Sequence, residues 1–276
     1  MPDKYFAENT MRSRKIIFLI IITTSCVGCV SVKNNNEKFK AVSSSSLLTN
    51  KLLDMTAHGM AKFDDIKQLV EKGAKTENIL VSDLSYNNNI DCRSVLYILK
   101  RNSYLYNDPV NLNSKPNNPY IKESDNHPRK EDLAYLADTG DGKTICNEAI
   151  NFLARLSPNM KNVQIKYDGS TAAHQYLKDI HHPDWSLDIA KLLISKGNVN
   201  KRRFEDGFTP AHVFLLENRK ICDKKNNGIL SSIIKEVEKK GGDLNIKSNY
   251  YFDHGKRAGI SLVEILSKLT HLCGKH

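Results

Sequence analysis

The residues that could carry chemistry in this chain are few, and the first candidate is a glycine-rich stretch. Residues 140–144 read Gly-Asp-Gly-Lys-Thr, which is the order that ends a phosphate-binding loop. Such a loop needs another glycine five residues before Gly142, where this chain has Ala137, and it follows a strand-like apolar run that is missing here. The same residues predict a tight turn, so we expect no nucleotide and no other cofactor.

Two further candidates fail for similar reasons. Residues 138–140 read Asp-Thr-Gly, but the triplet occurs once, and an aspartic protease needs a second carboxylate. His181, His182 and Asp184 offer metal ligands, yet adjacent histidines point in different directions and no further ligand follows at a known spacing. The sequence contains no Gly-x-Ser-x-Gly and no His-Glu-x-x-His. We therefore expect no catalytic residue, no bound metal and no enzymatic activity.

The composition is that of a globular protein, and the net positive charge favours a partner of negative charge. The chain has 276 residues, of which 26% are charged and 40% hydrophobic, as in ordinary globular domains. The 37 basic and 29 acidic side chains after residue 29 leave a charge of +8. A basic balance favours nucleic acid, an anionic membrane surface or an acidic protein, and the compartment decides among them.

The N-terminal segment has the form of an export signal. Basic residues follow Met11, residues 16–22 are uniformly apolar, and small residues come next. The apolar run is shorter than the roughly 20 residues that cross a bilayer. Residues 1–10 fit no signal, so we expect Met11 to be the true start.

Residues 26–29 (Cys-Val-Gly-Cys) resemble a bacterial lipobox, with Gly28 and Cys29 in their usual places and Cys26 where leucine is common. The resemblance implies that Cys29 is lipidated and becomes the N-terminus, and Val30 after it implies the outer membrane. The alternative is a signal that stays uncleaved or is cleaved in the ordinary way, without lipidation. Residues 1–29 are thus predicted to be the signal and residues 30–46, rich in Asn and Ser, a flexible tether.

Four cysteines follow the signal: Cys92, Cys146, Cys222 and Cys273. In an oxidising compartment they could form up to two disulfides, with three possible connectivities. Isolated cysteines in helical patterns can equally be small buried apolar side chains. The sequence specifies no particular bridge.

Similar segments recur along the body of the chain. Residues 206–212 read Asp-Gly-Phe-Thr-Pro-Ala-His, residues 168–174 read Asp-Gly-Ser-Thr-Ala-Ala-His, and residues 141–147 form a weaker copy with Asn147 in the His position. The segments resemble the ankyrin signature, Asp-Gly-x-Thr-Pro-Leu-His. In such a repeat Gly permits a tight turn, Thr caps a helix and Pro suits its first position. The resemblance gives a structural role to Gly169, Thr171, His174, Gly207, Thr209, Pro210 and His212.

The second helix of each repeat is also visible in the sequence. Residues 63–74, 189–197 and 229–245 place apolar residues at helical spacing and contain a glycine where a left-handed cap would end each helix. Residues 259–273 look like the first helix of a terminal repeat. We expect an all-α ankyrin-repeat solenoid over residues 47–276, with about four to five irregular helix-pair repeats.

Inserted loops make these repeats irregular. Residues 179–186 and 217–228 are expected to separate paired helices, and residues 102–130 form a longer stretch rich in Pro, Asn and Tyr. A helical-repeat solenoid binds through the loop tips and the first helices. The basic runs at 201–203 and 224–225 are too short to indicate nucleic acid, so we expect none.

Aromatic and arginine side chains at the tips are typical anchors of a protein interface. The candidate partner-binding residues are Tyr167, Trp185, Arg203, Phe204, Glu205, Tyr250, Tyr251 and Phe252. Packing of these aromatic rings under their own loops is the alternative. The sequence leaves open which face binds.

Anchor, repeats and the absence of catalytic motifs together resemble the lipoprotein immunity proteins that neutralise phospholipase effectors of type VI secretion. The resemblance implies a periplasmic protein held at the outer membrane by its lipid, whose partner is a cognate lipase. The tether would hold the binder beside the membrane that a lipase attacks. The alternative function is a host-directed or envelope ankyrin scaffold that mediates protein–protein interaction.

Overall fold

The chain is predominantly helical. The computed structural model describes residues 36–60, 62–81, 84, 91–120, 127–140, 143–195, 197–218, 223, 226–249, 251–253 and 256–273. Of residues 36–43, 227, 251–253, 256–258 and 270–273 it describes the main chain alone. Within these ranges the strands are limited to one hairpin, so the predicted all-α class is confirmed.

The α-helices are α1 (Asn36–Ala57), α2 (Phe63–Glu71), α4 (Cys92–Arg101), α5 (Pro109–Asn113), α6 (Asp132–Leu136), α7 (Asn147–Leu156), α8 (Ala172–Tyr176), α9 (Leu187–Leu193), α10 (Pro210–Glu217), α11 (Asn227–Lys239) and α12 (Leu262–Cys273). Short 3-10 helices are η1 (Ser103–Tyr106), η2 (Arg129–Glu131) and η3 (Pro158–Asn162). Strands β1 (Tyr251–Asp253) and β2 (Lys256–Ala258) pair antiparallel, with Phe252 opposite Arg257.

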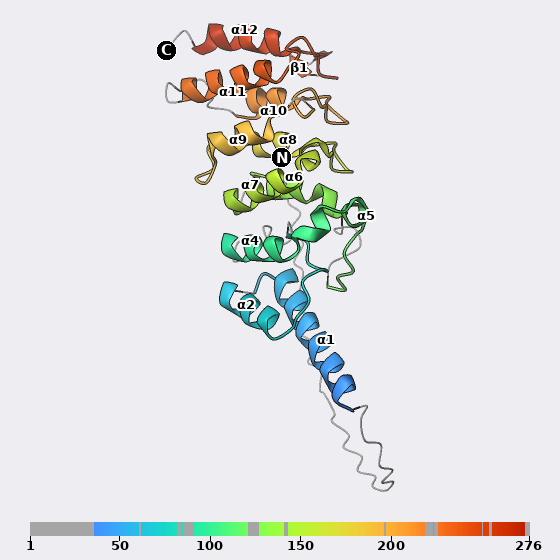
Figure 1. Cartoon of the computed structure of the whole chain (residues 1–276). Helices are drawn as coiled ribbons and strands as arrows, with labels where there is room; N and C mark the ends of the chain where they lie inside the picture. The colour runs from blue at the N-terminus through green and yellow to red at the C-terminus, as the bar shows by residue number, and fades with distance from the viewer. Residues whose placement is uncertain are drawn as a thin grey trace, which may run out of the picture.

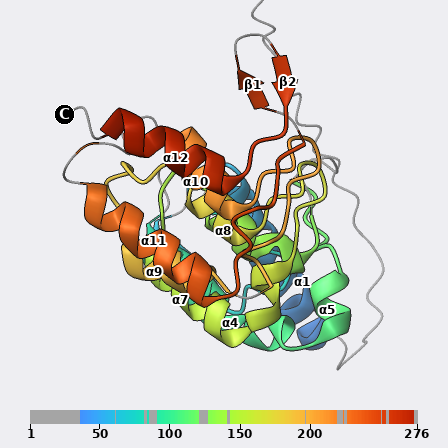
Figure 2. The same ribbon diagram turned by 90° about the horizontal axis from the view of Figure 1, so that it is seen from above.

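The helices stack in two columns along one axis (Figure 1). In the outer column α2, α4, α7, α9 and α11 each pack on the next, and in the inner column α6, α8, α10 and α12 do the same. Seen along the stack, the outer column lies on one side and the β hairpin projects from the other (Figure 2). Pairing of one inner with one outer helix therefore repeats along the molecule.

The core lies between the columns and follows from helical spacing. Each outer helix turns apolar residues three and four positions apart inward, and most of these are fully buried. Each such Leu or Ile contributes about 1.5–3 kcal/mol relative to an exposed position. The buried residues include Val95, Ile98, Leu99, Ala149, Ile150, Leu153, Ala190, Leu193, Ile233 and Val237.

A glycine was predicted to end three of the outer helices, and two of these predictions are confirmed. Gly73 after α2 and Gly241 after α11 have φ of 103° and 81°, the left-handed conformation that closes a helix. The prediction was wrong for Gly197. Helix α9 ends at Leu193, whose carbonyl accepts a bond of 2.9 Å from Asn198 Nδ2, so a side chain replaces the glycine cap.

The first helix begins earlier than the predicted domain boundary at residue 47. Helix α1 starts at Asn36, so residues 36–46 are helical and the prediction of a flexible tether was wrong for them. The run Glu-Lys-Phe-Lys-Ala at 37–41 has good helix propensity. Farther along the helix, Ser45 Oγ donates to Gly73 O at 2.8 Å, which joins α1 to the end of α2. The predicted tether residues 30–35 and the signal 1–29 lie outside the described residues.

The weaker repeat copy at 141–147 was predicted to lead into the first, inner helix of a repeat, and this prediction was wrong. Helix α7, which starts at Asn147, packs on α4 and α9 in the outer column. Its inner partner is α6, which packs on α8. The residues around 144 therefore form the loop between two paired helices, and Cys146 rather than Thr144 precedes the helix.

Candidate binding edge at the repeat tips

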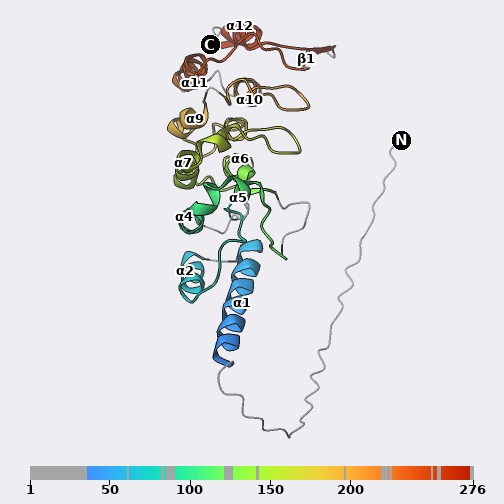
Figure 3. The ribbon, with the colours of Figure 1, turned by 45° about the vertical axis from the view of Figure 1, so that its right-hand side comes forward.

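Three loops, here called tips, lead from an outer helix to the next inner helix: the first tip (163–170), the second (201–208) and the third (247–260). They project on one side of the stack (Figure 3). Each is closed by one main-chain bond of 2.9 Å: Ile165 N to Ser170 O, Arg203 N to Phe208 O, and Ser248 N to Ile260 O. The same bond recurs just before α8, α10 and α12.

A threonine and a histidine start the inner helix after the first tip. Thr171 precedes α8, and its hydroxyl donates to His174 Nδ1 at 2.8 Å, while its own N–H donates to the same nitrogen at 3.1 Å. Because Nδ1 accepts both bonds, Nε2 carries the proton and donates to Phe208 O at 2.9 Å. His174 thereby joins the start of one inner helix to the next tip.

The arrangement recurs one repeat later. The Thr209 hydroxyl donates to His212 Nδ1 at 2.8 Å, and His212 Nε2 donates to Ile260 O at 3.1 Å. Pro210 occupies the first position of α10, where no N–H is needed. In the terminal helix Ser261 and Glu264 take over the reciprocal cap, with Ser261 N donating to Glu264 Oε2 at 2.7 Å.

Both histidines are fully buried, and burial decides their charge. Burial lowers the pKa of His174 to about 3, against the smaller opposing effect of its bond to Phe208 O. Burial also lowers the pKa of His212. Two neutral, sealed imidazoles that already use both ring nitrogens have no capacity for acid–base catalysis.

Consecutive tips also contact one another. Gly169 and Gly207 have φ of 75° and 66°, the left-handed conformation that glycine adopts without strain. Phe204 N donates to Asp168 O at 2.9 Å, and one repeat later Asn249 N donates to Asp206 O at 2.7 Å. The tips therefore form a ladder of main-chain hydrogen bonds along one edge of the stack.

Several of the predicted partner-binding side chains stand out from this edge. Tyr167 is 68% exposed and Phe204 58% exposed, and Glu205 is also exposed. Cys29 and Tyr250 lie outside the described residues, and Tyr251 and Phe252 belong to β1, of which only the main chain is described.

Arg203 and Trp185 contact their own chain. The Arg203 guanidinium pairs with Asp206 and, at 2.8 Å, with Glu217. These carboxylates raise its pKa against the effect of burial. Trp185 is half-buried, donates from Nε1 to Tyr176 O at 3.0 Å and stacks on the Tyr176 ring. Both side chains shape the loops that carry them.

The segment between α4 and α6, of which residues 102–120 and 127–131 are described, is here called the insertion, and it brings in exposed aromatics that were not among the predicted binding residues. Tyr104 is 53% and Tyr120 41% exposed, and Val110 between them is also exposed. The insertion lies on the same side of the stack as the tips (Figures 1 and 3). The available signal was the concentration of tyrosines at 104–120 within a polar stretch.

A buried polar cluster fixes this insertion. Tyr106 OH donates to Asp132 Oδ2 at 2.6 Å, and His127 Nε2 lies 3.0 Å from Asp132 Oδ1. Arg129 donates to Ser114 Oγ at 2.9 Å. All of these except Ser114 are almost fully buried, so the cluster positions the segment and offers no surface to a substrate.

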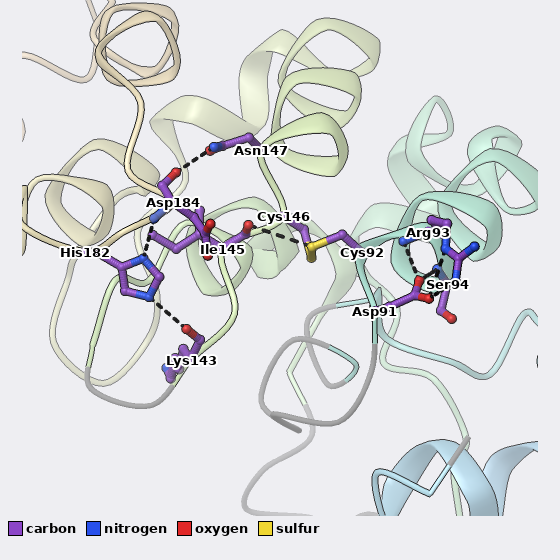
Figure 4. Close-up of a disulfide and its surroundings, with 10 residues drawn as sticks. All are labelled: Asp91, Cys92, Arg93, Ser94, Lys143, Ile145, Cys146, Asn147, His182 and Asp184. Carbon is purple, nitrogen blue, oxygen red and sulfur yellow. Dashed lines mark hydrogen bonds and ion pairs between the residues drawn. A yellow bond between two sulfur atoms is a disulfide. The ribbon is translucent and has the colours of Figure 1, made fainter. Parts of the chain in front are cut away.

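The other chemical candidates also have structural partners. Lys143, from the glycine-rich stretch, pairs with Asp138, which lies 3.6 Å from Lys178 Nζ. The two cations lower the pKa of Asp138 although burial opposes them. His182 Nε2 donates to Lys143 O at 2.9 Å, and its Nδ1 accepts from Asp184 N at 3.2 Å (Figure 4).

A disulfide joins two of the four cysteines whose pairing the sequence left open. Cys92 and Cys146 are bonded, with their Cα atoms 5.1 Å apart and a separation of 54 positions along the chain. Cys92 is the first residue of α4, and Cys146 immediately precedes α7 (Figure 4). The bond therefore connects the starts of two adjacent outer helices.

Within the described ranges, no three His, Cys, Asp or Glu side chains come together as metal ligands would. No described helix has the length and apolar character needed to cross a membrane.

Comparison with known proteins gives no relative. No family model, no curated protein and no solved structure matches this chain.

Proposed function

We propose that this chain is a lipid-anchored ankyrin-repeat solenoid, with about four to five irregular repeats and inserted loops, whose tips bind and neutralise another protein. The proposed partner is a secreted phospholipase-type toxin, which makes the chain an immunity protein. The proposed location is the periplasm, where the lipid on Cys29 holds it at the outer membrane. The proposal includes no cofactor and no reaction.

Recurrence of the same contacts between consecutive tips supports the ankyrin-repeat assignment. The histidine bonds run from His174 to Phe208 and from His212 to Ile260, which in each case is the residue before the next helix cap. The glycines of the pattern, Gly169 and Gly207, have left-handed backbones. An Asp-Gly turn, a Thr cap and a bridging His are what the resemblance implies for each repeat.

The binding proposal depends on one observation: the distribution of exposed aromatic rings. Among the described residues, the large aromatic side chains with the highest exposure are Tyr104, Tyr120, Tyr167 and Phe204. All four belong to the insertion or the tips, and none to the outer column. Exposed aromatics gathered on one side of a rigid stack are suited to anchor a protein interface.

Charge at the tips favours an acidic partner. Lys166, Lys201 and Arg202 are exposed beside Tyr167 and Phe204. Such a surface attracts an acidic protein over distance, and the attraction weakens as salt increases.

The disulfide supports the proposed compartment. Stable disulfides form in oxidising compartments such as the periplasm and are rare in the cytosol. The bond between Cys92 and Cys146 thus agrees with an export signal at the N-terminus.

Co-expression with a genetically neighbouring lipase, exported to the periplasm, tests the proposal. We expect the chain to restore growth, the Tyr167→Ser/Phe204→Ser variant to lose protection, and Leu47→Ser to retain it. Leu47 is the matched control because it is an exposed apolar residue on α1, at the other end of the stack from α12 (Figure 1). Unchanged killing with the intact chain present would exclude immunity, and delivery of the chain into host cells would instead favour the scaffold alternative.

A further inference from the structure

The Cys92–Cys146 disulfide combines a partly exposed cysteine with a buried one. Cys92 is partly exposed, whereas Cys146 is 1% exposed. A thiol from solvent therefore reaches Cys92 Sγ more readily than Cys146 Sγ. In thiol–disulfide exchange, the sulfur that is attacked forms the mixed disulfide and the other sulfur leaves as a thiolate.

Both sulfurs lie at helix N-termini, and both helices are long enough to have a substantial dipole. Helix α4 begins at Cys92 and α7 begins one residue after Cys146, and each helix has ten residues. At the start of α4, Asp91 Oδ1 already accepts from Arg93 N and Ser94 N, whereas no side chain caps the first N–H groups of α7. The positive end of α7 and these N–H groups stabilise a thiolate at Cys146, against the effect of its burial in the apolar core. A stabilised leaving thiolate makes a disulfide easier to reduce.

Nearby charges do not cancel this effect. Asp91 pairs with Arg93 at 2.6 Å, so the acid before Cys92 has an opposite charge beside it. Lys143, on the loop before Cys146, pairs with Asp138. The exposed Glu148 in the first turn of α7 is the acid that opposes a thiolate at Cys146.

We infer that the Cys92–Cys146 pair is a thiol–disulfide exchange site, at which Cys92 accepts a small thiol such as glutathione and Cys146 is the leaving thiolate. The glutathione thiolate attacks Cys92 Sγ, the S–S bond breaks, and its electron pair goes to Cys146 Sγ. A second glutathione thiolate attacks the glutathione sulfur of the mixed disulfide, which forms glutathione disulfide and releases the Cys92 thiolate. Two electrons pass to the protein, and each glutathione loses one proton.

Reduction at this site would act on the joint between two parts of the stack. Helix α4 packs on α7, and the long insertion follows α4 in the chain. With the bond open, the starts of α4 and α7 are held by packing alone. We expect amide hydrogens of these two helices to exchange faster in the reduced protein, while α9 to α12 keep their protection.

The test equilibrates the full-length chain in buffers of reduced and oxidised glutathione and measures the reduced fraction of the peptides that contain Cys92 and Cys146. Differential alkylation and mass spectrometry separate these cysteines from the others. We expect millimolar reduced glutathione to open the bond, and Glu148→Gln to shift the equilibrium toward the reduced form by about 2- to 5-fold. Asp188→Asn is the matched control, since Asp188 has the same place in the first turn of α9, which carries no cysteine; it should shift nothing.

Single-cysteine variants test the direction of attack. Glutathione disulfide should modify Cys92 in Cys146→Ser at least about tenfold faster than Cys146 in Cys92→Ser, because only the former sulfur is accessible. Equal rates, or a faster reaction at Cys146, would overturn the assigned roles. A bond that stays closed in glutathione, or equal shifts in Glu148→Gln and Asp188→Asn, would overturn the exchange site even if the single-cysteine variants fail to fold.

Discussion

The phenyl ring of Phe204 lies over the backbone of Gly169. A Cβ atom added to Gly169 would stand 2.7 Å from Cδ1 of that ring, which is closer than real side chains approach. The next pair of tips repeats the relationship, with the Asn249 amide 2.6 Å from the corresponding position of Gly207. The first and second tips are therefore each covered by a side chain from the tip that follows.

Replacement of Gly169 by alanine should destabilise the protein by about 1–3 kcal/mol, because the φ of 75° is strained for any residue with a Cβ. The collision with Phe204 adds to this cost and displaces the exposed ring. Urea unfolding of the variant gives the free energy. The Gly169→Ala/Phe204→Ala double variant should recover the part due to the collision and leave the part due to φ.

Gly228 provides the control for that change. It lies in the first turn of α11, has no neighbour within 4 Å of an added Cβ, and has no left-handed backbone. Gly228→Ala should be neutral or stabilising by up to about 1 kcal/mol. Equal losses of unfolding free energy in Gly169→Ala and Gly228→Ala would show that the left-handed backbone at Gly169 does not require glycine.

The stability of the protein should fall as the pH falls from 6.5 toward 4.5. His174 has a pKa of about 3 when folded and near its ordinary value of 6.5 when unfolded, so in this window the unfolded chain binds the extra proton. Stability then rises with pH, and one such histidine accounts for a loss of about 2 kcal/mol between pH 6.5 and 4.5. In His174→Gln the urea-derived free energy should change less over the same window; identical slopes in the two proteins would contradict the argument.

Loss of one hydroxyl should weaken the insertion from within. Tyr106→Phe removes the hydroxyl that donates to the buried Asp132 Oδ2, and the loss of this bond should cost about 1–3 kcal/mol. Tyr104→Phe is the matched change, because the exposed Tyr104 hydroxyl bonds Glu77 at 3.3 Å, and it should cost less than about 0.5 kcal/mol. Denaturant unfolding measures both losses. A larger loss in Tyr104→Phe than in Tyr106→Phe would refute the claim that the buried cluster stabilises the insertion.

Removal of the disulfide should cost much more than either tyrosine change. The bond closes a loop between residues 54 positions apart, and a cross-link of that length restricts the unfolded chain by about 4 kcal/mol. The Cys92→Ser/Cys146→Ser variant should unfold at a urea concentration well below that of the oxidised protein. A double variant as stable as the oxidised protein would mean that the unfolded chain gains nothing from the opened loop.

The sequence predicted the tip geometry well because that geometry depends on residues close together in the chain. A glycine with a left-handed backbone, a threonine before a helix and a histidine three residues later determine Asp168–His174 locally. The same holds for the helix caps at Gly73 and Gly241, where the chain needs only one glycine after an apolar helix.

The assignment of residues to inner and outer helices was predicted less well in the middle of the chain. The Gly-Lys-Thr order near 143 imitates a tip over a few residues, while the actual inner helix α6 lacks both the Thr and the His. A longer comparison would have found the helix, since residues 135–138 and 176–179 share the order Tyr-Leu-x-Asp. The pairing of Cys92 with Cys146 was beyond the sequence, because it depends on which helices become neighbours across the insertion.

The tip ladder separates the residues that build the edge from those that could recognise a target. Glycine, threonine and histidine fix the backbone from within, while Tyr167 points outward without a role in that scaffold. A side chain such as that of Tyr167 can therefore be exchanged while the loops keep their shape, whereas Phe204 also covers Gly169. One scaffold could in this way be reprogrammed for a succession of targets, by substitutions that leave its folding intact.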